Sequence, residues 1–228
     1  GYRAIATVQV NQIVESSVGS WTKESPFRGL QAFDEKHAAV FFGRNDAIFK
    51  LTQVVINQCQ LQDSVEMVMV LGPSGSGKTS LIRAGLLPAL INKPEALHLL
   101  SYSAFDLAEK GDHSLLTTLG GMLLDLETTA GAVFNNHSAS SLALLIQNNP
   151  DGVVNLLRQS LAALPPAIPA MAAIPQRHAL YIDRFEAIFD EKQISQIERN
   201  AFLKILDKLA RSQCLLIILA CRNDFYPQ

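Results

Sequence analysis

A glycine-rich stretch between an apolar run and a helical segment constrains the fold of this 228-residue chain more than any other feature. The run Val65 to Leu71 is short and mostly apolar, which predicts a buried strand of a parallel sheet. Lys78 to Leu87 has helical apolar spacing, and we predict that this helix stops near Pro88. The stretch itself reads Gly72, Pro73, Ser74, Gly75, Ser76, Gly77, Lys78 and Thr79. It matches the P-loop pattern G-x-x-x-x-G-K-[ST] in the strand-to-helix setting that a P-loop requires.

The residue types of this loop suit a nucleoside triphosphate. Glycines let the backbone N–H groups wrap around phosphates, and the start of the following helix attracts the same anion. We expect Lys78 to reach the β- and γ-phosphates and Thr79 to ligate Mg²⁺. The predicted ligand is therefore ATP, or ADP, with Mg²⁺. The predicted nucleotide-binding set is the whole loop together with the next residue, Ser80.

Acidic residues follow a second predicted strand, His178 to Asp183. An apolar strand that ends in an acid is the Walker B arrangement, so we expect Asp183 to hold Mg²⁺ directly or through water. Glu186 can polarise the attacking water as a general base. The alternative for Glu186 is a solvated carboxylate in the first turn of the next helix, where the helix dipole favours an acid.

An arginine follows the last apolar run, Cys214 to Cys221, which predicts a central strand. Arg222 can sense the γ-phosphate through charge-assisted hydrogen bonds. The alternative is an exposed arginine that closes a strand. We therefore treat Lys78, Asp183, Glu186 and Arg222 as the candidate catalytic residues.

Predicted strands alternate with predicted helices along the chain. One further strand is predicted at Ala96 to Tyr102, and the further helices are predicted at Asp46 to Gln60, Ser114 to Leu126, Asp151 to Leu164 and Phe202 to Leu209. This alternation predicts an α/β fold, a parallel sheet with helices on both faces. Ligands bind such sheets at the carboxyl ends of the strands, where the loop, the acids and Arg222 all lie.

Composition excludes several other classes of protein. With 19 basic and 21 acidic residues, the chain has no electrostatic footprint for nucleic acid or an anionic membrane. The three cysteines lack metal-binding spacing, which indicates buried thiols in a reducing compartment. The apolar stretch Leu161 to Pro175 contains four prolines and predicts a linker, not a membrane span. No signal peptide is recognisable, so we expect a cytoplasmic location.

Four ordered motifs resemble those of the novel STAND NTPases, signal-transduction ATPases related to AAA+ proteins. They are Ser25 to Leu30 with Phe41 to Arg44, Val70 to Leu90, Tyr181 to Glu186, and Ala220 to Tyr226. The resemblance implies a three-layer P-loop NTPase of ASCE type, with an extra strand between the Walker A and Walker B strands. It implies that Phe42, Gly43 and Arg44 lie near the adenine and that Arg222 is a phosphate sensor. One departure is Ala187, where the family often has a second glutamate, so slow turnover is expected.

The two ends of the chain suggest a larger protein. Gly1 to Ala6 resembles the last strand of an OmpR/PhoB-type winged-helix domain. We therefore expect residues 1–24 to be the end of an upstream DNA-binding domain plus a linker, and residues 25–228 to be a STAND-type NTPase core. That core is expected to stop before the helical lid of the family. DNA would be contacted only through the upstream domain, and further partners would be a second copy or intramolecular sensor domains.

The leading functional hypothesis is a nucleotide-dependent signalling switch with slow ATP hydrolysis, in a multidomain transcriptional regulator or sensor. One alternative is a P-loop phosphotransferase for small molecules, because metabolic kinases use the same loop. A kinase would need an acceptor pocket and a mobile lid within the same compact domain. Another alternative is a non-hydrolysing nucleotide-binding module that serves only the structure of a DNA-binding regulator.

Overall fold

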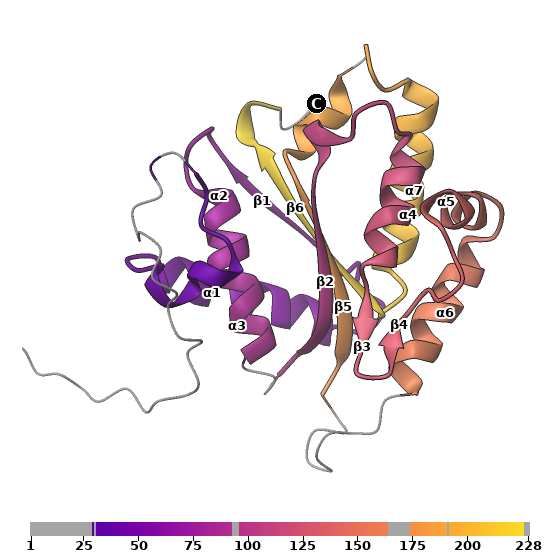
Figure 1. The fold of residues 1–228 in the computed structure, drawn as a ribbon. Helices are drawn as coiled ribbons and strands as arrows, with labels where there is room; N and C mark the ends of the chain where they lie inside the picture. The colour runs from indigo at the N-terminus through magenta and orange to yellow at the C-terminus, as the bar shows by residue number, and fades with distance from the viewer. Residues whose placement is uncertain (1–28, 30, 93–95, 164–173, 191, 226–228) are drawn as a thin grey trace, which may run out of the picture.

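A four-stranded parallel sheet forms the centre of the molecule (Figure 1). The computed structural model describes residues 29, 31–92, 96–163, 174–190 and 192–225. In spatial order the strands are β1 (Met67–Gly72), β6 (Leu215–Arg222), β5 (Gln176–Asp183) and β2 (His98–Asp106). The last strand in sequence, β6, separates the P-loop strand β1 from the Asp183 strand β5. The ASCE-type strand order implied by the resemblance is therefore confirmed.

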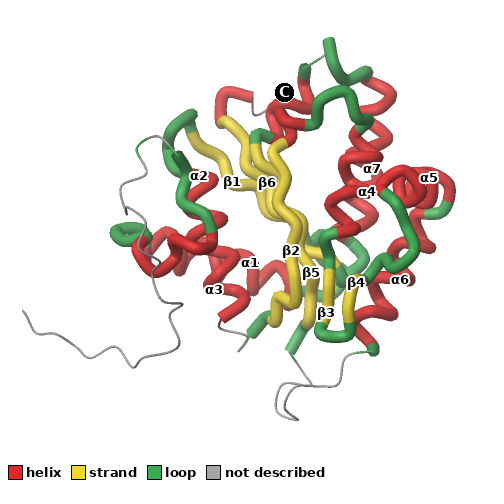
Figure 2. Tube along the Cα trace, in the orientation of Figure 1, coloured by secondary structure: helices red, strands yellow, loops and turns green. Residues whose placement is uncertain are grey.

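Helices cover both faces of the sheet, as Figures 1 and 2 show. One layer holds α1 (Asn45–Gln60), α2 (Lys78–Ser80) and α3 (Leu87–Asn92), and the other holds α4 (Leu115–Leu124), α5 (Ala139–Asn148), α6 (Pro150–Ala162) and α7 (Gln196–Ala210). Side chains of β6 alternate between the two hydrophobic cores of the molecule. Leu215, Ile217 and Leu219 lie in the core between the sheet and the layer of helices α4–α7, whereas Leu216 and Ile218 lie in the core on the side of helices α1–α3. Because both faces are covered, the central strands are continuous apolar runs. The expected three-layer α/β fold is confirmed.

The helix after the P-loop does not stop at Pro88, contrary to the sequence prediction. It runs from α2 through a π-helical segment, Leu81–Leu86, into α3, which ends at Asn92. Proline lacks the N–H that the next helical hydrogen bond needs, and a wider π turn directly before it changes the bonding pattern at that point. Local irregularity thus allows a proline that would otherwise end the helix.

Other elements differ in extent from the prediction. Strand β2 continues to Asp106 instead of ending at Tyr102, α7 begins at Gln196 instead of Phe202, and α5 had no counterpart among the predicted helices. A short hairpin, β3 (Glu127–Thr128) and β4 (Gly131–Ala132), follows α4. Short 3₁₀ helices lie at Glu35–Val40, Leu107–Glu109, Phe185–Phe189 and Asn223–Phe225. The predicted segments 1–24 and most of the proline-rich linker lie outside the described residues.

Strand β1 lies at one edge of the sheet. Within the described part of the chain it pairs only with β6. Its side chains Met69 and Leu71 are 40% and 41% exposed.

Buried polar groups lie at the amino ends of the strands, away from the P-loop. Arg177 donates from Nε and Nη2 to the two carboxylate oxygens of Glu66, at 2.6 and 2.7 Å. The fully buried His178 hydrogen-bonds the hydroxyls of Ser101 and Ser160. Burial lowers the pKa of His178 to about 4, so this ring is neutral near pH 7.

The three cysteines, Cys59, Cys214 and Cys221, are buried and free. Burial raises the pKa of the Cys59 thiol to about 12. The prediction of ordinary buried thiols is confirmed.

Candidate functional site

The glycine-rich loop joins the carboxyl end of β1 to α2 and depends on glycine at three positions. Gly75 and Gly77 have φ angles of 74° and 82°, in the left-handed region that favours glycine. A Cβ on Gly72 would lie 2.9 Å from Ser76 Oγ, which is too close for an ordinary contact. The backbone therefore bends into a tight loop, with the first turn of a helix directly behind it.

Lys78 lies at the start of α2 and bends back over this loop. Its Nζ donates to the carbonyl oxygens of Gly72 and Pro73, at 2.9 and 3.0 Å. These are weak, neutral acceptors for an ammonium group. An anion in the loop would offer Lys78 a stronger, charge-assisted partner.

Thr79 and Asp183, which are 104 positions apart in sequence, meet at the ends of α2 and β5. Thr79 Oγ1 donates to Asp183 Oδ2 at 2.7 Å, and Asp183 Oδ1 accepts the Arg184 N–H at 2.8 Å. Asp183 is only 9% exposed, so its carboxylate is held in one orientation. The structure thus brings together the two residues that the sequence predicted as metal ligands.

The Tyr181 hydroxyl lies beneath this pair. It is buried and has no hydrogen-bond partner among the described residues. Burial raises the pKa of Tyr181, and the neighbouring Asp183 carboxylate raises it further. Tyr181 therefore brings a buried polar group next to the Asp183 carboxylate, although the ring itself belongs to an apolar core.

Glu186 lies on the turn after β5 and reaches back to the neighbouring strand. Its Oε2 accepts the backbone N–H of Arg222 at 3.1 Å. Glu186 also lines a cavity of about 340 Å³ together with Ala108, Arg184, Ala187, Phe189, Asp190 and Phe225. The carboxylate is therefore directed by a hydrogen bond and borders an open cavity at the surface.

Arg222 is the register partner of Gly72, so it ends β6 beside the start of the P-loop. Its side chain, however, forms an ion pair with Asp224, with Nε–Oδ1 and Nη2–Oδ2 distances of 3.0 and 2.5 Å. The guanidinium also lies 5.5 Å from the centre of the Phe225 ring. The hydrogen bond from Arg222 holds the pKa of Asp224 below its usual value. Sequence reasoning placed Arg222 at this end of the sheet but did not foresee its partner.

The segment before α1 lies against the P-loop and its helix. Arg44 Nη2 donates to the Ser76 carbonyl at 3.2 Å. Arg83 makes a two-point ion pair with Glu35, at 2.9 Å for each contact. Ion pairs and hydrogen bonds thus fasten this segment beside the loop.

The predicted nucleotide-binding set also includes Phe42, Gly43 and Ser80, which lie in the segment before α1 and at the end of α2. Phe42 is 77% exposed, so its ring is not used in the core. Gly43 has a φ of 79° and lies at a bend of the chain before α1. Ser80 Oγ accepts the N–H of Phe33 at 3.0 Å, so its hydroxyl supports the N-terminal segment.

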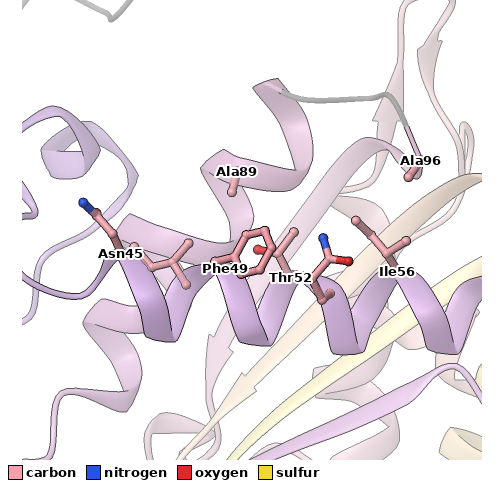
Figure 3. Close-up of a pocket in the computed structure, with 8 residues that line it drawn as sticks. Asn45, Phe49, Thr52, Ile56, Ala89 and Ala96 are labelled. Atoms are coloured by element: carbon pink, nitrogen blue, oxygen red, sulfur yellow. The ribbon is translucent and has the colours of Figure 1, made fainter. Parts of the chain in front are cut away.

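A larger cavity, about 440 Å³, lies elsewhere (Figure 3). It is lined by Asn45, Ile48, Phe49, Thr52, Gln53, Ile56, Ala89 and Ala96. Figure 3 shows the labelled side chains of α1 on the side that faces Ala89 of α3. None of the predicted site residues lines it, so its size alone does not make it the nucleotide site.

The residues at the loop fit a nucleotide phosphate and Mg²⁺. A hydroxyl and a carboxylate at 2.7 Å are the hard oxygen donors that Mg²⁺ prefers, and Mg²⁺ commonly binds one or two protein ligands plus phosphates and water. Within the described residues there is no cluster of three or more histidine, cysteine, aspartate or glutamate side chains that could hold a metal ion alone. A nucleotide phosphate would complete the donor set here.

Sequence reasoning missed Asp106 and Arg184. Arg184 Nε donates to both carboxylate oxygens of Asp106 at 2.6 Å, directly beside Asp183. Asp106 is the last residue of β2, as Asp183 is the last residue of β5, so each strand ends in an acid. Ending the predicted strand at Tyr102 hid that equivalence.

Comparison with known proteins places the chain in one family. The family model described as Novel STAND NTPase 1 matches residues 26–228. Among solved structures, "Structure of C. elegans PCH-2" is similar at 18% sequence identity and a TM-score of 0.40, and the match covers 79% of this chain and 38% of that chain. No curated protein matches the sequence. In the part of the chain that the structure describes, no helix combines the length and apolar character needed to cross a membrane.

Proposed function

The chain belongs to the novel STAND NTPase 1 family and is a nucleotide-binding NTPase module; on that premise, we propose that it is an ATP- and Mg²⁺-binding signalling switch with slow hydrolysis. The observation that carries the proposal is the contact of Thr79 with Asp183 at 2.7 Å, next to a loop whose left-handed positions, Gly75 and Gly77, are both glycine. A hydroxyl and a carboxylate from distant parts of the chain meet where phosphates would lie. That arrangement is the one expected of a P-loop site that also binds Mg²⁺.

The residues of the loop bind the phosphates in this proposal. The backbone N–H groups from Ser74 to Ser80 surround the phosphates, and Lys78 exchanges its two carbonyl acceptors for phosphate oxygens. Thr79 and Asp183 hold Mg²⁺, which supplies positive charge to the phosphate oxygens when it is bound. Phe42, Gly43 and Arg44 lie beside the adenine, and the contact of Arg44 with the Ser76 carbonyl supports this placement.

Glu186 is the proposed general base. Its hydrogen bond to the Arg222 N–H fixes one carboxylate oxygen and leaves the other available to a water molecule. The second glutamate that the family often has directly after the first is replaced by Ala187 in this chain. We therefore expect hydrolysis that is slow compared with nucleotide binding, as suits a switch.

Arg222 is the proposed sensor of the γ-phosphate. In this structure its guanidinium is paired with Asp224, and a phosphate would have to replace that partner. Such an exchange would move the segment after β6 when ATP binds but not when ADP binds. A ligand shifts a conformational balance only if it interacts differently with the two states, and this exchange provides such a difference.

The wider context is also a proposal. Residues 1–24 would end a winged-helix domain, and residues 25–228 would form the NTPase core. The output would then be transcriptional regulation, with DNA bound only by the upstream domain, while self-association or intramolecular sensor domains supply the signal.

Calorimetric titration with ATP and ADP, with and without Mg²⁺, tests the site. We expect Lys78→Ala to weaken ATP binding by roughly 10- to 100-fold, because it removes charge-assisted hydrogen bonds of about 1.5–3 kcal/mol. Lys50→Ala, at an exposed lysine of α1, is the matched control and should bind normally. Wild-type affinity in Lys78→Ala would refute the site.

Hydrolysis is tested separately by phosphate release. We expect Glu186→Gln to bind ATP like the wild type and to lose turnover by roughly 100-fold or more, the usual contribution of a general base. Glu127→Gln, at an exposed glutamate of the β3–β4 hairpin, is the control. Equal turnover in Glu186→Gln and wild type would return Glu186 to the role of a solvated carboxylate.

A further inference from the structure

Arg184, directly after Asp183, has an unusual backbone conformation. Its φ and ψ angles are 44° and 46°, in the left-handed region. Few residues other than glycine, asparagine and aspartate adopt this conformation without an energetic cost. Such a conformation persists only where the surroundings hold it, and it is often found at functional sites.

The Arg184 side chain supplies part of what holds this conformation. Its Nε lies 2.6 Å from each carboxylate oxygen of Asp106, and its Nη2 lies 3.3 Å from Glu109 Oε1. The side chain is 49% exposed, so the pair lies at the surface of the site and not in the core. An isolated surface ion pair contributes little stability, which makes a purely structural role a poor explanation for the strain.

The position of Asp106 gives this pair a further consequence. Asp106 and Asp183 are register partners at the carboxyl ends of the neighbouring strands β2 and β5, which lie side by side in Figure 1. The Arg184 guanidinium binds Asp106, so the residue directly after Asp183 is joined to the end of the neighbouring strand β2.

The same turn orients the Asp183 carboxylate. The left-handed conformation directs the Arg184 N–H to Asp183 Oδ1 at 2.8 Å, which leaves Oδ2 facing Thr79. The turn then leads into the 3₁₀ helix that carries Glu186 to the Arg222 N–H. One residue thus sets both the direction of the metal-binding oxygen and the path of the chain to the proposed base.

We propose that Arg184 and Asp106 form a positioning pair that presents Asp183 to Mg²⁺, and that Arg184 acts through Asp183 without touching the nucleotide. This inference rests on the proposed function. It predicts a defect confined to the metal-dependent part of nucleotide binding, because the P-loop itself is untouched.

The experiment compares Arg184→Gly, Asp106→Asn and the double variant in the full chain. Glycine accepts the left-handed backbone, so Arg184→Gly removes the cation without adding strain. ATP affinity is measured at increasing Mg²⁺ concentration, and Mn²⁺ bound with ADP is followed by electron paramagnetic resonance. The matched control is Arg211→Ala, which removes an exposed arginine that is paired with Asp207 of α7.

We expect each single variant to need three- to ten-fold more Mg²⁺ for half-maximal tightening of ATP binding, with ATP affinity in the absence of metal changed by less than two-fold. The double variant should resemble Arg184→Gly, because residues that act as a pair are not additive. Arg184→Lys keeps the charge but not the planar guanidinium group, so its increase in required Mg²⁺ should be smaller than that of Arg184→Gly.

Three results would overturn the inference. The first is an unchanged Mg²⁺ dependence of ATP binding in both single variants. The second is a double variant whose increase in required Mg²⁺ equals the product of the increases in the two single variants. The third is an equal loss of ATP affinity with and without metal, which would indicate general damage to the site. Failure of the proposed function is distinguishable, because the wild-type chain would then bind no ATP in any of these conditions.

Discussion

A methyl group added at Gly120 should destabilise the protein, whereas the same group at Gly121 should not. Both glycines lie in α4, whose next neighbour in the helical layer is α5. A Cβ on Gly120 would lie 2.3 Å from the Ala139 carbonyl oxygen and 3.3 Å from the Ala143 nitrogen. A Cβ on Gly121 would have no atom within 4 Å. The two positions therefore differ in packing but share their secondary structure.

The magnitude follows from two opposing effects. Replacing glycine by alanine inside a helix stabilises it by about 1 kcal/mol, since alanine loses less backbone entropy on folding. At Gly120 the new methyl group meets backbone atoms of α5, which cannot rotate away as a side chain can. Overpacking of this kind costs about 1–3 kcal/mol, occasionally more. We expect Gly121→Ala to gain up to about 1 kcal/mol. Gly120→Ala has the same gain but also the overpacking cost, so its net loss is expected to reach about 2 kcal/mol.

Urea unfolding followed by far-ultraviolet circular dichroism measures the difference. The midpoint should shift in opposite directions for the two variants, with similar slopes if both unfold in one cooperative step. In a thermal scan 1 kcal/mol corresponds to about 2–4 °C for a chain of this size. If Gly120→Ala proved as stable as Gly121→Ala, the close approach of α4 and α5 would be wrong.

Two further predictions concern the amino ends of the strands. Stability should fall as the pH drops from about 6.5 towards 4, because an unfolded His178 takes up a proton that the buried ring, with a pKa of about 4, refuses. The loss in the free energy of unfolding that is due to His178 reaches about 2 kcal/mol at pH 5. Urea titrations of His178→Gln should lack this loss, and the same pH dependence in His178→Gln and wild type would contradict the assignment. Arg177→Met should cost about 3–5 kcal/mol by leaving Glu66 buried and unpaired, and adding Glu66→Leu should restore a large part of that loss. A double variant no more stable than Arg177→Met would show that the ion pair is not the source of the effect.

The sequence predicted the parts of the fold that local chemistry determines. The continuous apolar runs of β5 and β6 are typical of strands covered on both faces, and the glycine spacing from Gly72 to Gly77 permits little besides a tight loop before a helix. The contact of Thr79 with Asp183 followed from the rule that strand ends in a parallel sheet share one edge. The place of β6 between β1 and β5 came from the family resemblance, since no local pattern encodes which strands become neighbours.

The remaining features depend on backbone geometry and contacts that the propensity of a single residue does not encode. Pro88 predicts a helix end by its own chemistry, but the π turn at Leu81–Leu86 changes the bonding pattern before it. Arg184 has no propensity for the left-handed region, and its ion pair with Asp106 of β2 joins residues that are far apart in sequence. Likewise, the pairing of Arg222 with Asp224 depends on the turn after β6. Such features are visible only when the neighbouring elements are in place.

Among the residues that the structure describes, β1 pairs on one side only, and this open edge has a practical consequence for all of these measurements. The strand sequence, Met67 to Gly72, contains no charged residue and no proline, the two devices that usually keep exposed strand edges from pairing with other chains. Edge-to-edge association of copies would add a strand whose end lies next to the P-loop. Apparent affinities that change with protein concentration would therefore indicate association of copies, and light scattering at each working concentration would separate that process from nucleotide binding itself.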